Sequence, residues 1–429
     1  MLRCWIVTGI LLLVALMIAG CGMATPTVSP TKLLNPRDAG IALRPTQTAT
    51  LVSTPSIMAT TSVPRPSPTS TSTPAPLPTI APELWATVGA SSETLIALQT
   101  NTSSQELGDI AVMRVDGTHY QQLTNYGYNR DPRLSPDRQR IAYRSVPLSI
   151  VSSPDRDTRL KEGKYNVWVI TVDGKQAWKL TDSEQPRSIP DWSPDSRKVL
   201  FSEGTAGALI ELEVDTQTRR EITRGVYSPR YRPGGGVGYL TEGGGLAWID
   251  EALAVHPLVA AETLPPHTRV NNFVWLQDGQ HVVYTLLDEP ADVWHLPESS
   301  VWIIDANGEN PTQLVAPITS VVYADLPLSA DNRFIAAREY AYGDACAPGA
   351  VAEFLALASD LKSARSFQLE SFAGLPADLM GAPFPVSNLV WISDQWAMGR
   401  FQVTCADASL FGWYLINPVE QRVIQVTRD

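Results

Sequence analysis

Three aspartates stand at comparable places in the chain and could act together as acids and bases. Asp131, Asp191 and Asp325 each come just before or within a short stretch that is expected to form the first strand of a repeated unit. Two carboxyl groups on either side of a bound sugar are the arrangement that glycoside hydrolysis needs, one as acid and the other as base or nucleophile. The sequence therefore offers one set of catalytic candidates, those of a glycan hydrolase or lyase.

Other reactive side chains lack the spacing that catalysis or metal binding requires. A nucleophile elbow of the form Gly-x-Ser-x-Gly does not occur. Asp305, Asn307 and Glu309 resemble a calcium loop only faintly and are expected to form an Asp-x-Asn-Gly turn instead. The five histidines are scattered without metal-ligand spacing: His119, His256, His267, His281 and His295. We therefore expect no metal, no cofactor and no enzymatic activity.

The elements that must position these residues form a repeat. The stretches RLSPDRQRIAYRS (133–145) and YNVWVITVDGKQAWKLT (165–181) are followed by DWSPDSRKVLFSE (191–203) and ALIELEVDTQTRREIT (208–223). Each pair of stretches contains four short strand patterns and two tight turns. One such unit cannot bury both of its faces, so the copies must stack radially against one another, as the blades of a β-propeller do.

The same template gives seven units between Leu84 and Thr427. The first unit begins with residues 84–89 as a strand, and the fourth is compressed into residues 231–260, with glycines in place of the usual turn residues. We therefore predict an all-β fold, a β-propeller of four-stranded antiparallel blades over residues 83–429, with seven blades. Six blades are the alternative, because a weak unit could be degenerate.

The repeats resemble those of TolB-type propellers, also called WD40-like or PD40 repeats. The resemblance is carried by Asp109-Ile110, Asp173-Gly174, Leu180-Thr181 and the run from Trp192 to Asp195. It implies the propeller fold, and propellers of this type commonly have six blades. Arg138 and Ser196 stand where the family usually has glycine, which leaves the type of that turn open.

The beginning of the chain reads as an export and anchoring segment. Residues 4–20 are apolar, and Ile18-Ala19-Gly20-Cys21 resembles the bacterial lipoprotein box, which implies cleavage and a lipid on Cys21. The alternative is that Cys21 ends a retained membrane segment. Residues 22–82 are rich in Thr, Ser and Pro and cannot form a core, so we expect a disordered stalk. Both interpretations place the protein in the cell envelope, on the outer face of a bacterial membrane.

Long loops are expected to gather on one face of the disc. In a four-stranded blade the first and third turns share a face, and the second loop shares the opposite face with the connection to the next blade. The second loops of the blades and the connections between blades contain every long insertion, at residues 146–164, 288–298, 340–351 and 371–387. Because binding residues concentrate on long loops of a rigid scaffold, we predict that this long-loop face is the working surface. Neutral variation of loop length is the alternative.

Two cysteines fall in neighbouring long loops. Cys346 and Cys405 occupy the second loops of predicted units six and seven, so they are expected to lie close together. Outside the cytoplasm such a pair favours a disulfide, and two free buried thiols are the alternative.

These observations predict a non-catalytic, lipid-anchored extracytoplasmic propeller, a monomer that binds a protein, peptide or envelope polymer. A propeller-fold glycan hydrolase or lyase is the alternative, and a structural or sensory part of an envelope complex is a third possibility. A role in nucleic-acid binding is not expected, because the net charge is −11 and basic residues form no run.

Overall fold

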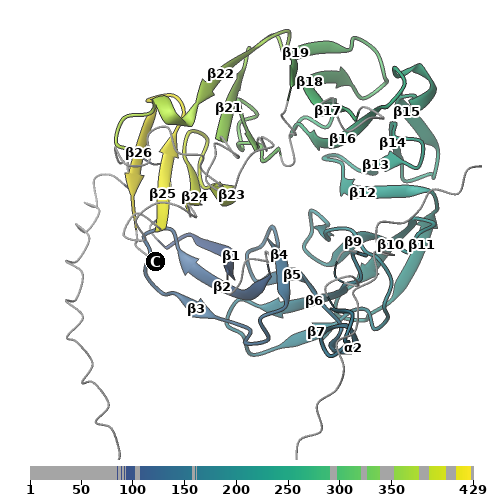
Figure 1. Cartoon of the computed structure of the whole chain (residues 1–429), viewed down its shortest axis with the longest axis vertical. Coiled ribbons are helices and arrows are strands. Elements are labelled where there is room, and N and C mark those ends of the chain that lie inside the picture. The colour runs from purple at the N-terminus through teal and green to yellow at the C-terminus, as the bar shows by residue number, and fades with distance from the viewer. Residues whose placement is uncertain are drawn as a thin grey trace, which may run out of the picture. The chain divides into compact units, whose positions relative to one another are not determined.

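The computed structural model arranges the repeats as a ring of antiparallel sheets (Figure 1). It describes Trp85, Val88 and residues 91–426, except for 92, 102–106, 157–159, 161, 290–296, 320–325, 339–351, 376–385 and 402–411. The predicted export segment, the stalk, Cys21, Asp325, Cys346 and Cys405 lie outside the described residues. The lipidation, the stalk and the disulfide therefore stay predictions.

Seven blades follow one another along the chain, each built from consecutive strands. Blade 1 contains β1 (Leu95–Asn101), β2 (Gly108–Arg114) and β3 (Gln121–Gln122). Blade 2 contains β4 (Asn129–Leu134), β5 (Arg140–Ser145), β6 (Asn166–Thr171) and β7 (Ala177–Lys179). Blade 3 contains β8 (Asp191–Trp192), β9 (Lys198–Glu203), β10 (Ala208–Glu213) and β11 (Arg219–Thr223). Blade 4 contains β12 (Val226–Tyr231), β13 (Val237–Thr241), β14 (Leu246–Ile249) and β15 (Val255–Val259). Blade 5 contains β16 (Thr268–Trp275), β17 (His281–Asp288), β18 (Glu298–Asp305) and β19 (Thr312–Thr319). Blade 6 contains β20 (Phe334–Arg338), β21 (Ala352–Leu357) and β22 (Ala364–Gln368). Blade 7 contains β23 (Val386–Trp391), β24 (Ala397–Phe401), β25 (Gly412–Asn417) and β26 (Arg422–Gln425).

Polarity changes from the centre of each blade to its rim. Figure 1 shows β4, β12, β16 and β23 near the middle of the ring and β7, β11, β15, β19 and β26 at its edge. In blade 3 the middle strand β9 buries Val199, Leu200 and Phe201 in succession, whereas the rim strand β11 is largely exposed. A middle strand is covered by a neighbouring blade on both faces, so it reads as a continuous apolar run instead of an alternating one.

Among the described residues, seven clusters of buried apolar side chains form the core of the ring, one between each pair of neighbouring blades. Between blades 3 and 4, for example, Leu200 and Leu209 pack against Val226 and Tyr239. The ring closes in the same way, because Ile96 and Met113 of blade 1 share a cluster with Met398 and Leu415 of blade 7. The predicted propeller is confirmed, and with seven blades rather than six. In the described part, blades 1 and 7 exchange no strand, so side-chain packing closes the ring.

Two boundaries differ from the predictions. Residues 84–89 were expected to form a strand, but Trp85 and Val88 are helical and both are buried in the cluster between blades 7 and 1. Residues three apart on a helix share one face, so this turn buries both side chains together. Blade 4 was expected to begin near Tyr231, but its innermost strand already starts at Val226.

The sheets of blades 1 and 2 are joined by backbone pairing between Gly108 and Asn129.

The repeated turn explains the departures from glycine. Arg138 and Ser196 have φ values of 59° and 61°, in the left-handed region that glycine usually fills. The Ser196 hydroxyl accepts a hydrogen bond of 2.9 Å from the Asp137 backbone N–H in the turn of the preceding blade. Gly279 holds the equivalent place in blade 5, where an added Cβ would lie 2.1 Å from the Pro233 carbonyl oxygen. Serine therefore replaces glycine where a link between blades is possible, and glycine stays where two backbones meet.

The Asp305 segment is a turn, as predicted. Asn307 Oδ1 accepts a hydrogen bond from the Glu309 N–H, and the Gly308 N–H donates to the Asp305 carbonyl. No helix among the described residues is long and apolar enough to cross a bilayer.

Candidate functional site

Hydrogen bonds assign the turns and loops to two faces of the disc. On one face the turn after β4 meets the turn after β6, since the Val172 N–H donates to the Gln139 carbonyl at 3.0 Å. On the other face Arg187, in the connection to blade 3, reaches the Tyr165 carbonyl at the start of β6. For blade 2 the turns and loops are therefore divided as predicted, and the face with the 146–164 insertion is the long-loop face. Residues 290–296, 340–351 and 376–385 of the other predicted insertions lie outside the described residues, so their place on this face stays a prediction.

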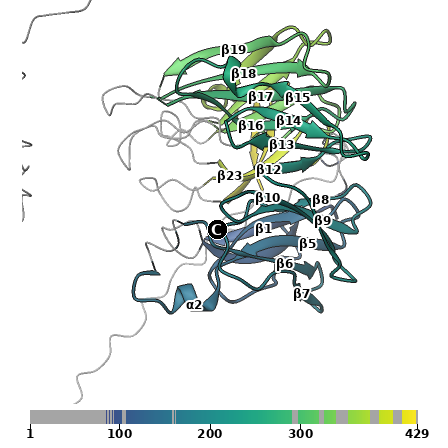
Figure 2. The ribbon, with the colours of Figure 1, turned by 90° about the vertical axis from the view of Figure 1, so that its right-hand side faces the viewer.

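The blade 2 insertion is folded onto this face over a small core of its own. It contains the short helix α2 (Leu148–Val151), which projects from one side of the ring in the edge-on view (Figure 2). Ile150 and Val146 point inward and pack with Leu107 and Tyr165. Leu148, in contrast, is 67% exposed. A large apolar side chain is thus presented to solvent from a supported loop.

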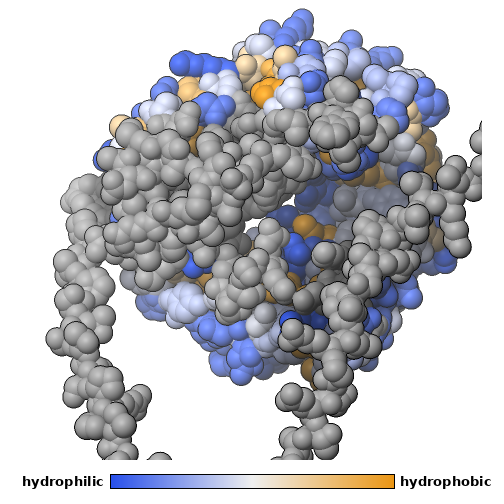
Figure 3. Space-filling model, in the orientation of Figure 1, coloured by the Kyte–Doolittle hydropathy of each residue, from blue (hydrophilic) through white to orange (hydrophobic). Residues whose placement is uncertain are grey.

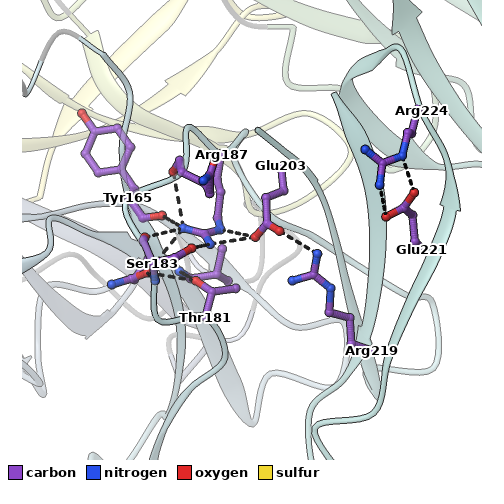
Figure 4. Close-up of polar contacts among 11 residues, drawn as sticks. Tyr165, Thr181, Ser183, Arg187, Glu203, Arg219, Glu221 and Arg224 are labelled. Atoms are coloured by element: carbon purple, nitrogen blue, oxygen red, sulfur yellow. Dashed lines mark hydrogen bonds and ion pairs between the residues drawn. The ribbon is translucent and has the colours of Figure 1, made fainter. Parts of the chain in front are cut away.

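Arg187 is the centre of the polar network beneath this face (Figure 4). Its side chain is 1% exposed and forms an ion pair of 2.7 Å with Glu203. Its guanidinium also donates to the Tyr165 carbonyl at 2.6 Å and to the Ser183 hydroxyl at 2.6 Å. A buried charge persists only when it is paired and hydrogen-bonded, and Arg187 meets both conditions. It ties blade 2, blade 3 and the connection between them together.

Glu203 joins that network to the rim of blade 3. Its second oxygen accepts a hydrogen bond of 2.6 Å from Arg219. Burial by itself would raise the pKa of Glu203, but Arg219 and Arg187 outweigh burial and lower the pKa below its ordinary value. The carboxylate is therefore ionised at neutral pH. Figure 4 also shows the Arg224–Glu221 pair, which lies at the exposed edge of the same blade.

Asp131, the first catalytic candidate, is bound by two arginines. It sits in a bulge of β4 with a φ of 55°, and its Oδ2 accepts hydrogen bonds from Arg130 Nε at 2.8 Å and Arg144 Nη2 at 2.5 Å. Burial would raise its pKa, but Arg144 and Arg130 hold the pKa below the usual value. Arg144 also lies over the Tyr165 ring, 4.6 Å from its centroid. A carboxylate held in this way is a structural anion more than a free base.

Asp191, the second candidate, lies on the inner strand of the next blade. Its Oδ2 accepts a hydrogen bond of 2.8 Å from the Tyr231 N–H of blade 4. Burial raises its pKa, and the charges of Arg230 and Arg133 oppose the rise without cancelling it. Arg133 also lowers the pKa of Asp131, so this arginine acts on both carboxyls. Two of the three candidates thus lie on the inner strands of neighbouring blades, and Asp325 lies outside the described residues.

The histidines serve local contacts. His281 Nδ1 lies 2.6 Å from Asp278 Oδ2 in a tight turn, and His256 stacks on Trp248 with ring centroids 4.1 Å apart. Within the described ranges, no three His, Cys, Asp or Glu side chains gather as a metal site would need.

The tryptophans of the first strands bind neighbouring blades. Trp192 Nε1 donates to the Arg133 carbonyl at 2.8 Å, and Trp391 Nε1 donates to the Pro327 carbonyl at 2.9 Å. Both acceptors occupy the same place in the preceding blade. A packing role for these rings is therefore observed.

Sequence reasoning overlooked the arginines. Arg133 and Arg230 fall at the same repeat position as Asp191, one residue before the inner-strand residue that packs between blades. Superposing the repeats would have shown this charged position. Arg187 carries no such signal, because it lies in an irregular connection and its burial depends on three separate segments.

No family model matches the chain, and no curated protein matches it either. Solved structures that match include TolB from Acinetobacter baumannii, with 15% sequence identity over 67% of this chain and 66% of that chain and a TM-score of 0.44. They also include oligogalacturonate lyase from Vibrio parahaemolyticus, with 12% identity, 71% and 82% coverage and a TM-score of 0.48. A third is the β-propeller domain of the trilobed protease from Pyrococcus furiosus, with 11% identity, 78% and 91% coverage and a TM-score of 0.46. The described strands themselves show that the chain is a seven-bladed β-propeller.

Proposed function

We propose that the protein is a non-catalytic, lipid-anchored extracytoplasmic propeller that binds a protein, peptide or envelope polymer through its long-loop face. The observation that carries this proposal is the blade 2 insertion, which is supported by its own core and by Arg187 while it presents Leu148 outward. Exposed apolar side chains on a rigid support are typical anchors of interfaces.

A glycan hydrolase or lyase receives less support. Asp131 is already bound by Arg130 and Arg144, so it is poorly placed to act as a nucleophile or to activate water. The inner-strand rings that could stack on sugars are turned into the blade interfaces, as Trp192 shows. The geometry therefore favours binding over catalysis.

The full-length protein, extracted from membranes in detergent with its partners, tests the binding face. Leu148→Asp is expected to reduce partner recovery by at least about tenfold, because it places a charge at the centre of the contact. Val255→Asp is the matched control, because Val255 is 56% exposed on the rim strand β15, away from the insertion. Equal recovery with both variants would rule out the assigned face.

The anchor requires a separate test. Cys21→Ser should abolish acylation, and mass spectrometry of the mature N-terminus should then find no diacylglycerol on the chain. A wild-type protein whose N-terminus lacks lipid and retains residues 1–20 would instead favour the membrane-segment alternative.

A further inference from the structure

A pocket of about 520 Å³ lies between blades 5 and 6. Its walls are the turns that precede β17 and β20 and the turn that follows β21. The first and third turns of blade 6 meet here, since the Leu357 N–H donates to the Arg333 carbonyl at 2.8 Å, so the pocket lies on the face opposite the long-loop face. Its volume is within the range of small-molecule sites, about 300 to 1,000 Å³.

The floor of the pocket is apolar. Leu276, Leu357 and Leu361 line it and belong to the cluster between blades 5 and 6. Leu276 is buried, whereas Leu357 and Leu361 are half-buried. On the face that Figure 3 shows, the rim of the disc is mainly hydrophilic. An apolar floor that solvent can reach is favourably covered by an aliphatic group of a ligand.

Charged side chains of both signs stand around this floor. Asp278 comes from blade 5, and Asp331 and Arg333 come from blade 6. The Arg333 side chain is 60% exposed, and its Nε lies 3.9 Å from Asp331 Oδ2, beyond the length of a hydrogen bond. Within the described part of the chain this guanidinium makes no hydrogen bond, so its donors are available to a ligand.

The two carboxylates keep acceptor capacity. Asp278 accepts hydrogen bonds from two backbone N–H groups of its own turn, and its Oδ2 lies 2.6 Å from His281 Nδ1. Burial by itself would raise the pKa of Asp278, but these hydrogen bonds lower the pKa below its ordinary value. Asp331 Oδ1 accepts from the Ser329 hydroxyl and the Arg333 N–H, whereas Asp331 Oδ2 has only the loose contact with Arg333. Since a carboxylate offers about four lone-pair sites, each can accept a further donor.

A hydrogen bond between blades fixes the two acidic turns. The Gln277 N–H donates to Asn332 Oδ1 at 2.7 Å, which ties the turn of Asp278 to the turn of Asp331. The charged groups are therefore held in place before a ligand arrives, and less conformational entropy is lost on binding.

We propose that this pocket binds a free aliphatic α-amino acid as its zwitterion. The three leucines cover the side chain of the ligand, the carboxylates of Asp278 and Asp331 bind its ammonium group, and Arg333 binds its carboxylate. A carboxylate ligand without an amine meets two like charges, and an amine without a carboxylate meets the Arg333 cation. The site is separate from the long-loop face and independent of the function proposed for that face.

Equilibrium dialysis of the full-length protein in detergent against radiolabelled L-leucine tests the proposal, with empty micelles as the blank. Two analogues serve as competitors: isocaproate lacks the amine of leucine, and isoamylamine lacks its carboxylate. Each should compete about tenfold more weakly than leucine, because it loses one charge-assisted contact. No binding of leucine, or competition by either analogue as strong as by leucine itself, overturns the proposal.

The charge contact has a matched pair of variants. Arg333→Gln should weaken leucine binding about tenfold without weakening isoamylamine, which has no carboxylate to lose a partner. Arg197 follows the same turn in blade 3 and its side chain is 68% exposed, so Arg197→Gln is the control and should leave binding unchanged. Unchanged leucine binding in Arg333→Gln, or an equal loss in both variants, contradicts the assignment.

The apolar floor has a second pair. Leu361 has a φ of 57°, which asparagine tolerates, so Leu361→Asn keeps the turn and should reduce leucine binding about tenfold. Leu253 holds the equivalent turn position in blade 4 with a φ of 65°, and Leu253→Asn should leave binding unchanged. Normal binding in Leu361→Asn, or an equal loss in Leu253→Asn, would show that this floor does not hold the ligand. If thermal unfolding shows that Leu361→Asn is not folded, the competition by the two analogues on the unmutated protein decides.

Discussion

Individual buried charges matter here because they add side-chain contacts between segments that the backbone joins only through isolated bridges. Arg187 is surrounded by Tyr165, Ser183 and Glu203, which come from a blade, a connection and the next blade. Removing one member of such a group leaves the other members buried and unsatisfied. The side chains of the Arg224–Glu221 pair are 64% and 38% exposed, so removing one of them leaves the other accessible to water.

Arg187→Met is expected to lower the free energy of unfolding by about 3 to 5 kcal/mol, because Glu203 and three backbone carbonyls lose a buried partner. Arg224→Met, from the exposed pair, should cost less than about 1 kcal/mol. Urea denaturation of both variants measures the difference, and similar losses would show that burial of Arg187 contributes nothing special.

Glu203 should make stability depend on acid. Its pKa is lower in the folded protein than its ordinary value of 4.5, so the folded state is favoured above that value. This contribution is lost as the pH falls through the folded pKa. Wild type should therefore exceed Glu203→Gln by a constant margin near neutral pH, and the margin should shrink in acid. A margin that stays constant down to the lowest pH at which the fold persists contradicts this assignment, and Glu221→Gln serves as the exposed control.

At the scale of elements, the repeat motif works through a recurring clasp. Asp109 is the second residue of β2 and accepts a hydrogen bond from the Thr124 hydroxyl, and Thr124 Oγ1 in turn accepts one from the Ile110 N–H. In blade 2 the Val167 N–H donates to Thr181 Oγ1 in the same manner. The threonine at the end of a blade therefore binds the chain to the third strand of that blade. It does so at the point where the backbone hydrogen bonds between the third strand and the rim strand stop. This is the physical role of the Leu-Thr ending found in the sequence.

The turns between blades give an element-scale prediction. Ser196→Ala loses the hydrogen bond from Asp137 and keeps the left-handed backbone, so it should destabilise by about 2 kcal/mol. Ser196→Gly loses the same bond but relieves the backbone, and should be about 1 kcal/mol more stable than the alanine variant. Thermal unfolding ranks the two, and the reverse order would contradict this account of the turn. Arg138→Gly, at the equivalent turn, should be no less stable than wild type.

At the scale of the whole molecule, the ring depends on the interface between blades 7 and 1. That interface contains Trp396, Met398 and Trp413 opposite Ile96 and Met113, and no exchanged strand supports it in the described part. Every other interface is backed by chain continuity. We therefore expect opening to begin here.

Trp396→Ala should cost about 3 to 5 kcal/mol through the cavity that it leaves. Hydrogen exchange in β1, β2, β24 and β25 should rise by about a hundredfold or more, while β9 and β10 stay protected. Phe201→Ala, in the interface of blades 2 and 3, is the comparison, and its effect should be centred on those blades. Uniform acceleration in the Trp396 variant would show that the ring unfolds only as one unit.

The sequence by itself determined the fold class, most of the strand order and, in blade 2, the division of turns and loops between two faces. These follow from local causes: apolar runs, Pro-Asp and Asp-Gly turns, and the need of one thin sheet for neighbours on both sides. It failed at Trp85 and Val88, where burial in the closing interface outweighs the pattern of a strand. Tertiary structure alone decided the number of blades, the burial of Arg187 and the effect of Arg133 on the pKa of both Asp131 and Asp191. Those outcomes depend on contacts between residues far apart in the chain, and a charged side chain reads the same in sequence whether it faces solvent or a buried partner.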